Sequence, residues 1–425
     1  MKLSECCIKI GSGATPRGGK ESYLESGPFS LIRSQNVHNN LFLRSGLAFI
    51  SEEQARQLQN VEVKSDDVLL NITGDSVARV CQVPDDVLPA RVNQHVAIIR
   101  PDPNKLLNKY LRYFLVNPKM QSHMLSLASA GATRNALTKG MIESFELPKT
   151  TLSEQKAIAS VLGALDDQIE NNRQMNQTLE EMARAIFKSW FVDFDPVHAK
   201  AAGNAPAHMD AETAALFPNS FDDDGLPVGW HSKSLDQIAD FLNGAAMQKF
   251  PAEGDRFLPV IKIAELRNGI SSNTNRATPD VPQKYLVSDG DVLFAWSGSL
   301  MQKVWTEGTG ALNQHLFKVT SETYQKWFFY YWIDHHMKWF QSIAASKATT
   351  MGHIQRSHLT EAKVCVPDSL ILDAASANIA PLLEKQIQNS LENKTLTELR
   401  DTLLPKLMSG EIRVRDAERG MEATI

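Results

Sequence analysis

Long apolar runs are missing from this sequence. The longest strongly apolar run, Trp327 to Ile333, falls far short of the roughly 20 residues that a membrane-spanning helix needs. The stretch Met1–Cys6 has no apolar core of the kind found in signal peptides. These absences argue against membrane insertion and export, so the cytoplasm is the expected compartment.

Cysteine is scarce, and its spacing excludes two kinds of small scaffold. No two cysteines form a CxxC pair, so neither a zinc ribbon nor a disulfide framework is predicted. The cysteines are Cys6, Cys7, Cys81 and Cys365.

Catalytic motifs are missing too. The sequence has no GxGxxG after a strand, no GxSxG, no HExxH and no Asn/Asp-Pro-Pro-aromatic tetrad of the kind that amino-methyltransferases use. Residues Gly13–Glu21 resemble a phosphate-binding loop, but the lysine stands one place late and Glu21 replaces the Ser or Thr that would bind magnesium. Adjacent His335 and His336 lack metal-ligand spacing, because neighbouring helical side chains point about 100° apart. We therefore expect no catalysis, metal or cofactor in this chain.

Net positive charge, the usual mark of a DNA-binding protein, is absent, since 44 basic and 49 acidic residues give −5. This total is a sum over segments whose net charges differ in sign. Residues 1–150 carry +4 and residues 231–367 carry +2, whereas residues 201–230 carry −5 and the segments 151–200 and 368–425 carry −3 each. The two mildly basic segments suit contact with a polyanion, and a basic partner would add to the attraction.

What the sequence does contain is a long internal repeat, which has to be found before any fold is assigned. Several short matches occur in the same order at offsets between 216 and 224 residues. They are Ser65–Leu70 with Ser288–Phe294, Asn93–His95 with Asn313–His315, Ala132–Thr133 with Ala348–Thr349, Phe145–Pro148 with Val364–Pro367, Ile158–Ala159 with Ile379–Ala380, and Asn176–Glu181 with Asn393–Glu398. The chain is therefore interpreted as a tandem duplication.

Each copy has the same plan. Short apolar runs punctuated by Gly, Pro and Asp turns predict a mixed α/β domain, which Pro148 or Pro367 closes before a long helical pattern. The aromatic block Trp327–Trp332 is more typical of a core than of a base-stacking platform. The predicted fold is of the α+β class: two mixed α/β domains, separated by a pair of long antiparallel coiled-coil helices, in a pseudo-twofold tandem duplication.

Seam positions in the first helical pattern alternate steps of four and three, as in a heptad seam. The second pattern has a similar apolar stripe with one five-residue step, from Leu391 to Leu396, that breaks the heptad. A helix over 153–191 would be about 58 Å long, with a cap at Thr151–Glu154, and the second helix should end near Ser409–Gly410. Ordinary amphipathic core helices are the alternative, but Asn172 and Asn176 favour a coiled coil, in which such residues fix the register. The predicted seam comprises Ile158, Leu162, Leu165, Ile169, Leu179, Ile186 and Trp190, with Ile379, Leu383, Ile387, Leu399, Leu403 and Leu407.

These patterns predict six segments. The linker is assigned from residues 201–230, which contain no Lys or Arg and several Ala, Gly and Pro residues. The segments are a first mixed α/β domain at 1–150, a central long helix at 151–196, the linker at 197–230, a second mixed α/β domain at 231–367, a distal long helix at 368–412 and a C-terminal tail at 413–425.

Several stretches carry a family resemblance. They are Leu147–Pro148, Ser153–Ala159, Leu165–Glu170, Ala185–Pro196, Leu226–Trp230 and Leu403–Ile412. Together they closely resemble the specificity subunits of type I restriction-modification systems, and the resemblance spans essentially the whole chain.

The resemblance implies a non-catalytic DNA-recognition subunit. In that family two target-recognition domains each read one half of a split, asymmetric DNA site, while the paired helices hold them apart and dock two modification subunits. Two restriction subunits, with motor and nuclease activity, are expected to join through these. The partners would use S-adenosylmethionine, ATP and magnesium in a prokaryotic cytoplasm. The rival interpretation is a protein-binding scaffold without direct base readout, and an enzyme is the third.

Base-reading side chains are harder to select. Asn and Gln pair with adenine and Arg with guanine, but Asn93–Gln94 and Asn313–Gln314 are identical in the two copies. Because half-sites normally differ, a framework or backbone role is favoured for these four. Better candidates are aligned positions at which the copies diverge, although ordinary surface polarity is the alternative for each. They are Ser34–Asn36 against Ile263–Glu265, Arg79 against Lys303, Arg134–Asn135 against Thr350–Met351, and Asn71, Thr73 and Asp75 against Trp296, Ser297 and Ser299.

The predicted DNA-binding set has members in both copies. In the first copy they are Thr15, Arg17, Arg33, Gln35, Asn36, Asn71, Thr73, Asp75, Arg79, Asn93, Gln94, Arg134 and Asn135. In the second copy they are Lys262, Glu265, Trp296, Ser297, Ser299, Lys303, Asn313, Gln314, Lys347, Thr350 and Met351.

Overall fold

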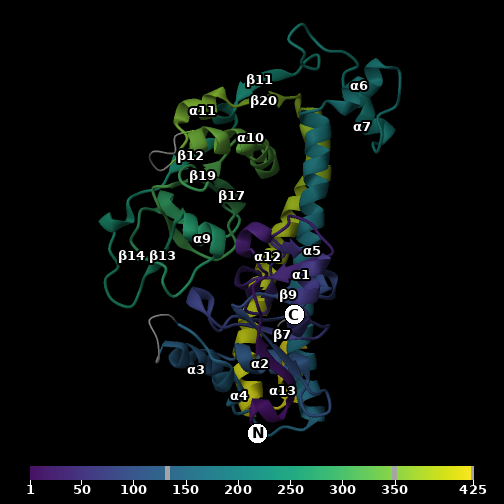
Figure 1. The fold of residues 1–425 in the computed structure, drawn as a ribbon. Coiled ribbons are helices and arrows are strands. Elements are labelled where there is room, and N and C mark those ends of the chain that lie inside the picture. Colours follow the sequence, from purple (N-terminus) through teal and green to yellow (C-terminus); the bar gives the residue numbers. More distant parts are fainter. Residues whose placement is uncertain (130–134, 347–351, 423–425) are drawn as a thin grey trace. The chain divides into compact units, whose positions relative to one another are not determined.

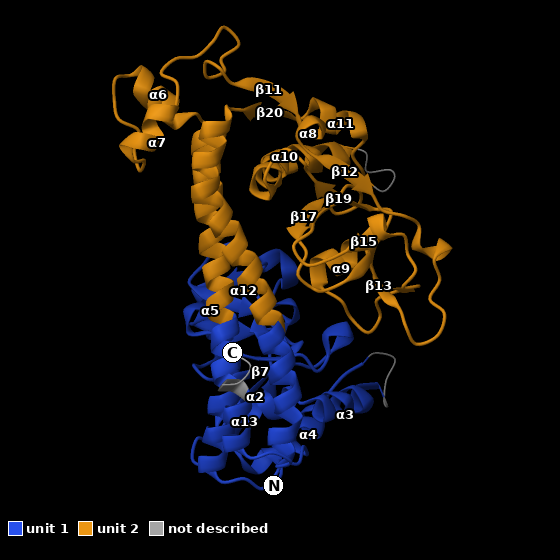
Figure 2. Cartoon of the chain, turned by 180° about the vertical axis from the view of Figure 1, so that it is seen from behind, with its two compact units in different colours: residues 1–169, 395–425 blue, residues 170–394 orange. Residues whose placement is uncertain are grey.

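The computed structural model describes residues 1–129, 135–346 and 352–422 (Figure 1). The chain forms two compact units, which Figure 2 colours separately. Unit 1 contains Met1–Ile169 and Thr395–Ile425, and unit 2 contains Glu170–Lys394.

Unit 1 contains two four-stranded sheets. In the first, every pair of neighbours is antiparallel, whereas the second has one parallel pair at its centre. The first sheet has the order β1 (Cys7–Ser12), β10 (Val96–Pro101), β7 (Val68–Asn71), β8 (Val80–Gln82). The second has the order β5 (Ala48–Ile50), β2 (Phe29–Ile32), β9 (Ala90–Val92), β6 (Glu62–Val63), with β2 and β9 parallel.

Unit 2 repeats this topology. Its first sheet is again antiparallel throughout, and its second again has a central parallel pair. The first sheet has the order β12 (Asp240–Asn243), β19 (Leu316–Thr320), β16 (Val292–Ala295), β17 (Met301–Val304). The second has the order β14 (Arg276–Ala277), β13 (Leu258–Ile261), β18 (Gly310–Leu312), β15 (Leu286–Val287). Two units with one strand order and one pattern of strand directions confirm the predicted duplication and the α+β fold class.

The strands β7 and β16 are buried at every residue, because both faces of each strand are covered. Helices pack on one face and the second sheet on the other. The covering helices are α2 (Asn108–Val116), α3 (Pro118–Ser129) and α4 (Lys139–Glu143) in unit 1, and α8 (Leu235–Ile238), α10 (Lys326–Ser346) and α11 (Arg356–Glu361) in unit 2. In α10 the block Trp327–Trp332 lies largely inside this core, with Trp327 and Trp332 each only 2% exposed, which confirms its interpretation as core.

Shorter elements connect these layers. The remaining helices of unit 1 are α1 (Glu52–Gln57) and α13 (Val414–Glu422), with 3-10 turns η1 (Leu3–Glu5), η2 (Gly19–Ser22), η3 (Ser34–Asn36), η4 (Gln59–Val61), η5 (Gly74–Ser76) and η6 (Asp85–Val87), and a hairpin of β3 (Val37–His38) and β4 (Leu41–Phe42). Those of unit 2 are α6 (Asp195–Ala201), α7 (Ala211–Leu216) and α9 (Ile263–Asn268), with η7 (Met247–Lys249), η8 (Gln283–Tyr285) and the pair β11 (His231–Ser234) and β20 (Lys363–Val366).

Two long helices contribute to both units, α5 (Leu152–Phe191) and α12 (Ser369–Ser409). A reciprocal cap begins α5, since the Thr151 backbone N–H donates to Glu154 Oε2 at 2.8 Å and the Glu154 N–H donates to Thr151 Oγ1 at 3.2 Å. Gly410, with φ +74, follows the end of α12. In each unit the α5 part lies beside the α12 part (Figure 2).

Asparagines join the two helices in unit 2. Asn172 Nδ2 donates to Asn393 Oδ1 at 3.1 Å, and Asn389 Nδ2 donates to Asn176 Oδ1 at 2.9 Å. The partner number falls as the α5 number rises, so the helices are antiparallel. Asn176 Nδ2 also donates to the Gln386 carbonyl and to Ser390 Oγ.

The predicted seam differs in burial along its length. The buried members are Ile158, Leu162, Leu165, Ile169, Trp190, Ile379, Leu383, Leu403 and Leu407. Leu179, Ile186, Ile387 and Leu399 are half-buried. No helix in the described ranges combines the length and the apolar character that crossing a membrane requires.

The segment expected as a linker is partly folded. It contains most of α6 and all of α7, and Phe217 after α7 is only 2% exposed, with its ring edge-to-face on Trp190 at 5.2 Å. Lys200 Nζ donates to the Ala214 carbonyl at 2.8 Å. Buried aromatic contacts such as that of Phe217 with Trp190 thus hold this segment against the rest of unit 2. Its many small residues show no periodic pattern, so the sequence did not predict these helices. The six segment boundaries stay predictions.

Candidate nucleic-acid interface

One turn is built in the same way in both units. Between β9 and β10 the Asn93 N–H donates to the Ile32 carbonyl at 3.0 Å, and Asn93 Oδ1 accepts from the His95 N–H at 3.1 Å. Between β18 and β19 the Asn313 N–H donates to the Ile261 carbonyl at 3.1 Å, and its Oδ1 accepts from the His315 N–H at 3.4 Å. Both asparagines are 6% exposed, and each of these bonds joins the asparagine to a backbone group of its own unit.

A glycine lets the main chain approach this turn closely. A Cβ on Gly13 would lie 2.1 Å from the Val92 carbonyl oxygen, and a Cβ on Gly244 would lie 2.2 Å from the Asn313 carbonyl oxygen. The next residues complete the contact, because Ala14 N–H donates to Val92 O at 3.1 Å and the equivalent bond joins Ala245 to Leu312. The glycine that looked like part of a phosphate loop therefore serves this contact.

A histidine side chain bridges two neighbours at each turn. His95 Nδ1 lies 2.6 Å from Thr73 Oγ1, and its Nε2 lies 3.1 Å from Gln94 Nε2. The second copy places Ser297 Oγ 3.0 Å from His315 Nδ1, and Gln314 Nε2 3.4 Å from His315 Nε2. The hydroxyl, imidazole and amide therefore occur in the same order in both units.

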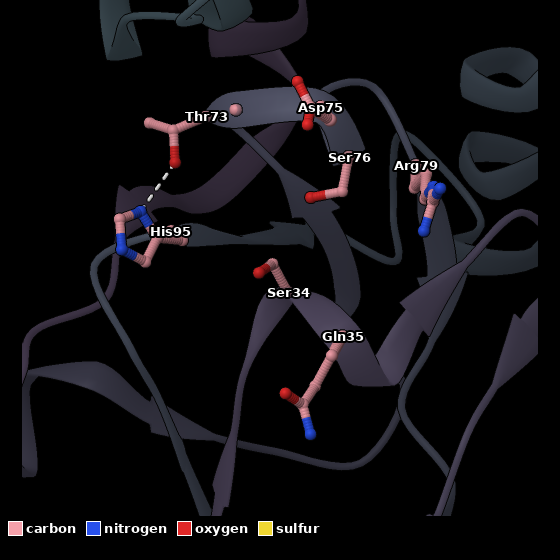
Figure 3. A pocket seen from close by; sticks show the side chains of 8 residues that line it. Ser34, Gln35, Thr73, Asp75, Ser76, Arg79 and His95 are labelled. Atoms are coloured by element: carbon pink, nitrogen blue, oxygen red, sulfur yellow. Dashed lines mark hydrogen bonds between the residues drawn. The ribbon is translucent and has the colours of Figure 1, made fainter. Parts of the chain in front are cut away.

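Unit 1 has a pocket of ≈ 440 Å³ beside this turn (Figure 3). Figure 3 shows side chains of two segments facing each other across it, with His95 at one side. The pocket brings together four predicted site residues, Gln35, Thr73, Asp75 and Arg79. The complete lining is Ser34, Gln35, Thr73, Gly74, Asp75, Ser76, Arg79 and His95. Ser76 and His95 were not predicted, although the duplicated Asn-Gln-His sequence carried a signal for the histidine.

The pocket carries both charge signs and a fixed amide. Arg79 and Asp75 both line it. Burial lowers the pKa of His38, and the charge of Arg79 lowers it further. Gln35 Nε2 donates to the Gly46 carbonyl at 3.0 Å, which orients that side chain. Such a mixture of donors and acceptors suits base edges better than it suits a uniformly negative backbone.

Unit 2 has an aromatic side chain, Trp296, beside its bridging histidine. The half-buried Trp296 ring lies 6.0 Å from His315 and 6.3 Å from His353, and its Nε1 donates to Asn243 Oδ1 at 3.0 Å. Lys262 Nζ donates to Asn275 Oδ1 at 2.5 Å. The two units therefore share the glycine contact, the asparagine turn and the bridging histidine, and they differ in the side chains around these.

Strand register corrects two of the predicted alignments. Asn71 lies opposite Val96, and Ala295 lies opposite Leu316, so Asn71 corresponds to Ala295 and Trp296 corresponds to Ile72. Lys303 lies opposite Leu293, as Cys81 lies opposite Leu69, so Lys303 corresponds to Cys81 and not to Arg79. The loops between these strands differ in length, which alignment at a constant offset misses.

Several predicted DNA contacts are buried, Asn36, Asn71 and Glu265 among them. Asn36 and Asn71 are each 0% exposed and Glu265 is 7% exposed. Asn71 Nδ2 donates to the Ser34 and Val37 carbonyls, and Asn36 Nδ2 donates to the Leu43 carbonyl. Glu265 Oε2 accepts from the Lys262 N–H at 3.1 Å. These side chains are polar because they hold backbone groups inside the domain.

Most other predicted contacts remain accessible. Those exposed or half-exposed are Thr15, Arg17, Arg33, Gln35, Thr73, Asp75, Arg79, Gln94, Asn135, Lys262, Trp296, Ser299, Lys303 and Gln314. Ser297 is buried at 3% exposure and serves His315. Arg134, Lys347, Thr350 and Met351 lie outside the described residues, as do Ala132–Thr133 and Ala348–Thr349.

Comparison with known proteins identifies the family. Residues 1–181 and 227–400 match the family described as Type I restriction modification DNA specificity domain. The chain is 26% identical to the specificity subunit of the type I restriction enzyme HindI from Haemophilus influenzae, over 90% of this chain and 94% of the relative. It is 28% identical to the MjaIX specificity subunit from Methanocaldococcus jannaschii, over 77% of this chain and 74% of the relative.

A solved structure supports the same assignment at the level of the fold. The crystal structure of a type I restriction-modification S subunit from M. genitalium has a TM-score of 0.55 and 16% identity, covering 96% of this chain and 95% of that one. The family match falls on both copies of the repeat. The chain therefore belongs to the type I restriction-modification specificity subunits, which recognise DNA sequence and are not themselves catalytic.

Proposed function

We propose that this chain reads a bipartite, asymmetric DNA site and docks two modification subunits, and through them two restriction subunits. Each half-site is read by one lobe. We call the part of unit 1 that precedes α5 lobe 1, and the part of unit 2 from β11 to β20 lobe 2. S-adenosylmethionine, ATP and magnesium belong to the partner subunits in this proposal.

The observation that carries the proposal is the duplicated frame with unlike side chains around it. Both lobes keep the glycine contact, the asparagine turn and the bridging histidine. Around this frame Asp75 and Arg79 line a pocket in lobe 1, whereas lobe 2 has Trp296 beside His315, at the position that Ile72 holds in lobe 1. A backbone frame that both lobes share, surrounded by side chains that differ, suits two domains that read different DNA sequences with the same geometry.

The long helices suit a spacer role. A continuous helix of 40 residues is about 60 Å long, and successive major-groove faces of B-DNA recur about every 34 Å. The two asparagine pairs, each with one buried member, favour one register of the two helices. Base pairs between the half-sites would then be spaced without being contacted.

A lobe exchange tests the proposal. The complete chain is co-expressed with its modification subunit, and N6-methyladenine is mapped genome-wide. Replacing lobe 1 by the corresponding lobe of a relative with another target should change one half of the methylated motif and leave the other half intact. Replacing lobe 2 should do the reverse.

The matched control exchanges the same lobe with that of a relative that has the same half-site, which should leave the motif unchanged. A methylated motif that ignores both exchanges would overturn the proposal and favour a scaffold whose lobes bind protein.

A further inference from the structure

The glutamine beside the bridging histidine has the same partner in both lobes. Gln94 Nε2 lies 3.1 Å from His95 Nε2, and Gln314 Nε2 lies 3.4 Å from His315 Nε2. We infer that Gln94 and Gln314 each read an adenine, at equivalent positions of the two half-sites, and that His95 and His315 position them. This inference rests on the proposed function.

The hydrogen bonds assign the histidine proton. An amide Nε2 only donates, so His95 Nε2 accepts from Gln94 and its proton lies on Nδ1, which donates to Thr73 Oγ1 at 2.6 Å. Figure 3 shows this second bond. Ser297 provides the same acceptor for His315 at 3.0 Å. A hydroxyl in each lobe thereby accepts the Nδ1 proton of the tautomer whose Nε2 accepts from the glutamine.

The bond to histidine leaves a defined edge of the amide available. Gln94 is exposed, and among the described residues its Oε1 meets no donor. One Nε2 proton is used by His95, so the second Nε2 proton and Oε1 remain available to a ligand. The exposed edge therefore presents one donor and one acceptor in a fixed order.

This edge matches adenine better than the other candidates. Adenine offers the N7 acceptor and the N6 donor in the major groove, whereas guanine offers two acceptors there. A phosphate group has acceptors only and would leave Oε1 without a partner. The neighbouring Asn93 is buried and bonded to the His95 N–H, so Gln94 is the member of the pair that reaches outward.

Identity between the lobes then has a functional reason. Side chains that differ between the lobes suit bases that differ between the half-sites. A donor–acceptor edge held in the same way in both lobes suits a base pair that both half-sites share. The structure thus divides recognition between a common contact at Gln94 and Gln314 and specific contacts around it.

The test is substitution of each glutamine in the full chain, co-expressed with its modification subunit, followed by genome-wide mapping of N6-methyladenine. Gln94→Ala should make one A·T position degenerate in the half-site of lobe 1, with roughly a 5- to 100-fold loss of discrimination there. Gln314→Ala should do the same in the other half-site. Gln57→Ala, an exposed glutamine on α1, is the matched control and should leave the motif unchanged.

The positioning role has its own test. Thr73→Val removes the acceptor for His95 Nδ1 and should relax the same A·T position as Gln94→Ala, by a smaller factor. Thr73→Ser keeps the hydroxyl, as Ser297 does in lobe 2, and should restore wild-type discrimination. Thermal unfolding is measured for each variant, and Gln94→Met, which keeps the side-chain volume, replaces Gln94→Ala if that variant unfolds early.

Two results would overturn the inference. One is an unchanged motif in Gln94→Ala and Gln314→Ala. The other is a uniform loss of methylation at all sites with the motif intact, which would mean a backbone contact. Either result combined with a successful lobe exchange would refute this inference and leave the proposed function standing.

Discussion

His336 on α10 is a histidine whose surroundings keep it neutral at pH values at which a free imidazole would be protonated. Its ring lies 6.1 Å from Trp332 and 6.0 Å from Phe340, and Nε2 donates to the Lys363 carbonyl at 2.8 Å. Burial is the main cause that lowers the pKa of His336 from 6.5 to about 4. The neutral ring thus pins α10 to the start of β20.

Unit 2 should lose stability as the pH falls from 6.5 towards 4. The unfolded chain takes up a proton on His336 in this window while the folded chain does not, so protonation favours unfolding. His336→Gln keeps an N–H donor and removes the titration. We expect its free energy of unfolding to drop less than that of the wild type between pH 7 and pH 5, by roughly 1–2 kcal/mol.

Urea unfolding at the two pH values, with hydrogen exchange of α10 as the local probe, measures this difference. The exposed His208 supplies the control, and His208→Gln should follow the wild type. Parallel pH curves for wild type and His336→Gln would contradict the assignment.

At the scale of elements, one carboxylate joins three helices of unit 1. Asp166 on α5 accepts from Arg112 Nη2 and from the Tyr113 hydroxyl of α2, both at 2.6 Å, and from Arg400 Nη1 of α12 at 2.9 Å. The side chains of Asp166, Arg112 and Arg400 are 13%, 11% and 12% exposed. Lobe 1 is thereby tied to the helix pair by a compact polar network.

Asp166→Asn should destabilise unit 1 by about 2–3 kcal/mol, because it leaves two nearly buried guanidinium groups without their shared carboxylate. Urea unfolding gives the change. Glu143→Gln, which removes a salt bridge between Lys139 and Glu143 with side chains 63% and 38% exposed, is the control and should stay close to wild type. Equal stability of Asp166→Asn and wild type would show that the network is not needed.

Local sequence patterns predicted the positions of the long helices better than they predicted which strands pair with each other. The three-four spacing located α5 and α12, and Asn172 and Asn176 marked the seam, because these signals lie within a single helix. The parallel pair β2 and β9 joins residues far apart in the chain, and nothing local encodes it. The misassigned Asn71 follows from the same limit, since strand partners and burial, and not residue type, decide whether a polar side chain is free to bind.

At the scale of the whole molecule, the charge distribution limits what the chain does by itself. The segments 1–150 and 231–367 carry only +4 and +2, while the remainder is acidic. Each phosphate contact that releases counterions contributes about −0.9 to the slope of log K against log salt concentration. The small net positive charge of these segments therefore predicts a shallow salt dependence, and specificity in this chain has to rely on side-chain geometry such as the edges of Gln94 and Gln314.

The chain alone should therefore bind DNA with a shallow salt slope that becomes markedly steeper when the modification subunits are added, because the partners then supply most phosphate contacts. Fluorescence anisotropy with one duplex carrying the target site, over a series of salt concentrations, measures both slopes. Arg17→Ala, which removes an exposed cation four residues after Gly13, should reduce the slope by about 1 if Arg17 contacts a phosphate, and the motif should stay unchanged. A slope for the chain alone as steep as that of the complex would show that the lobes hold the backbone themselves.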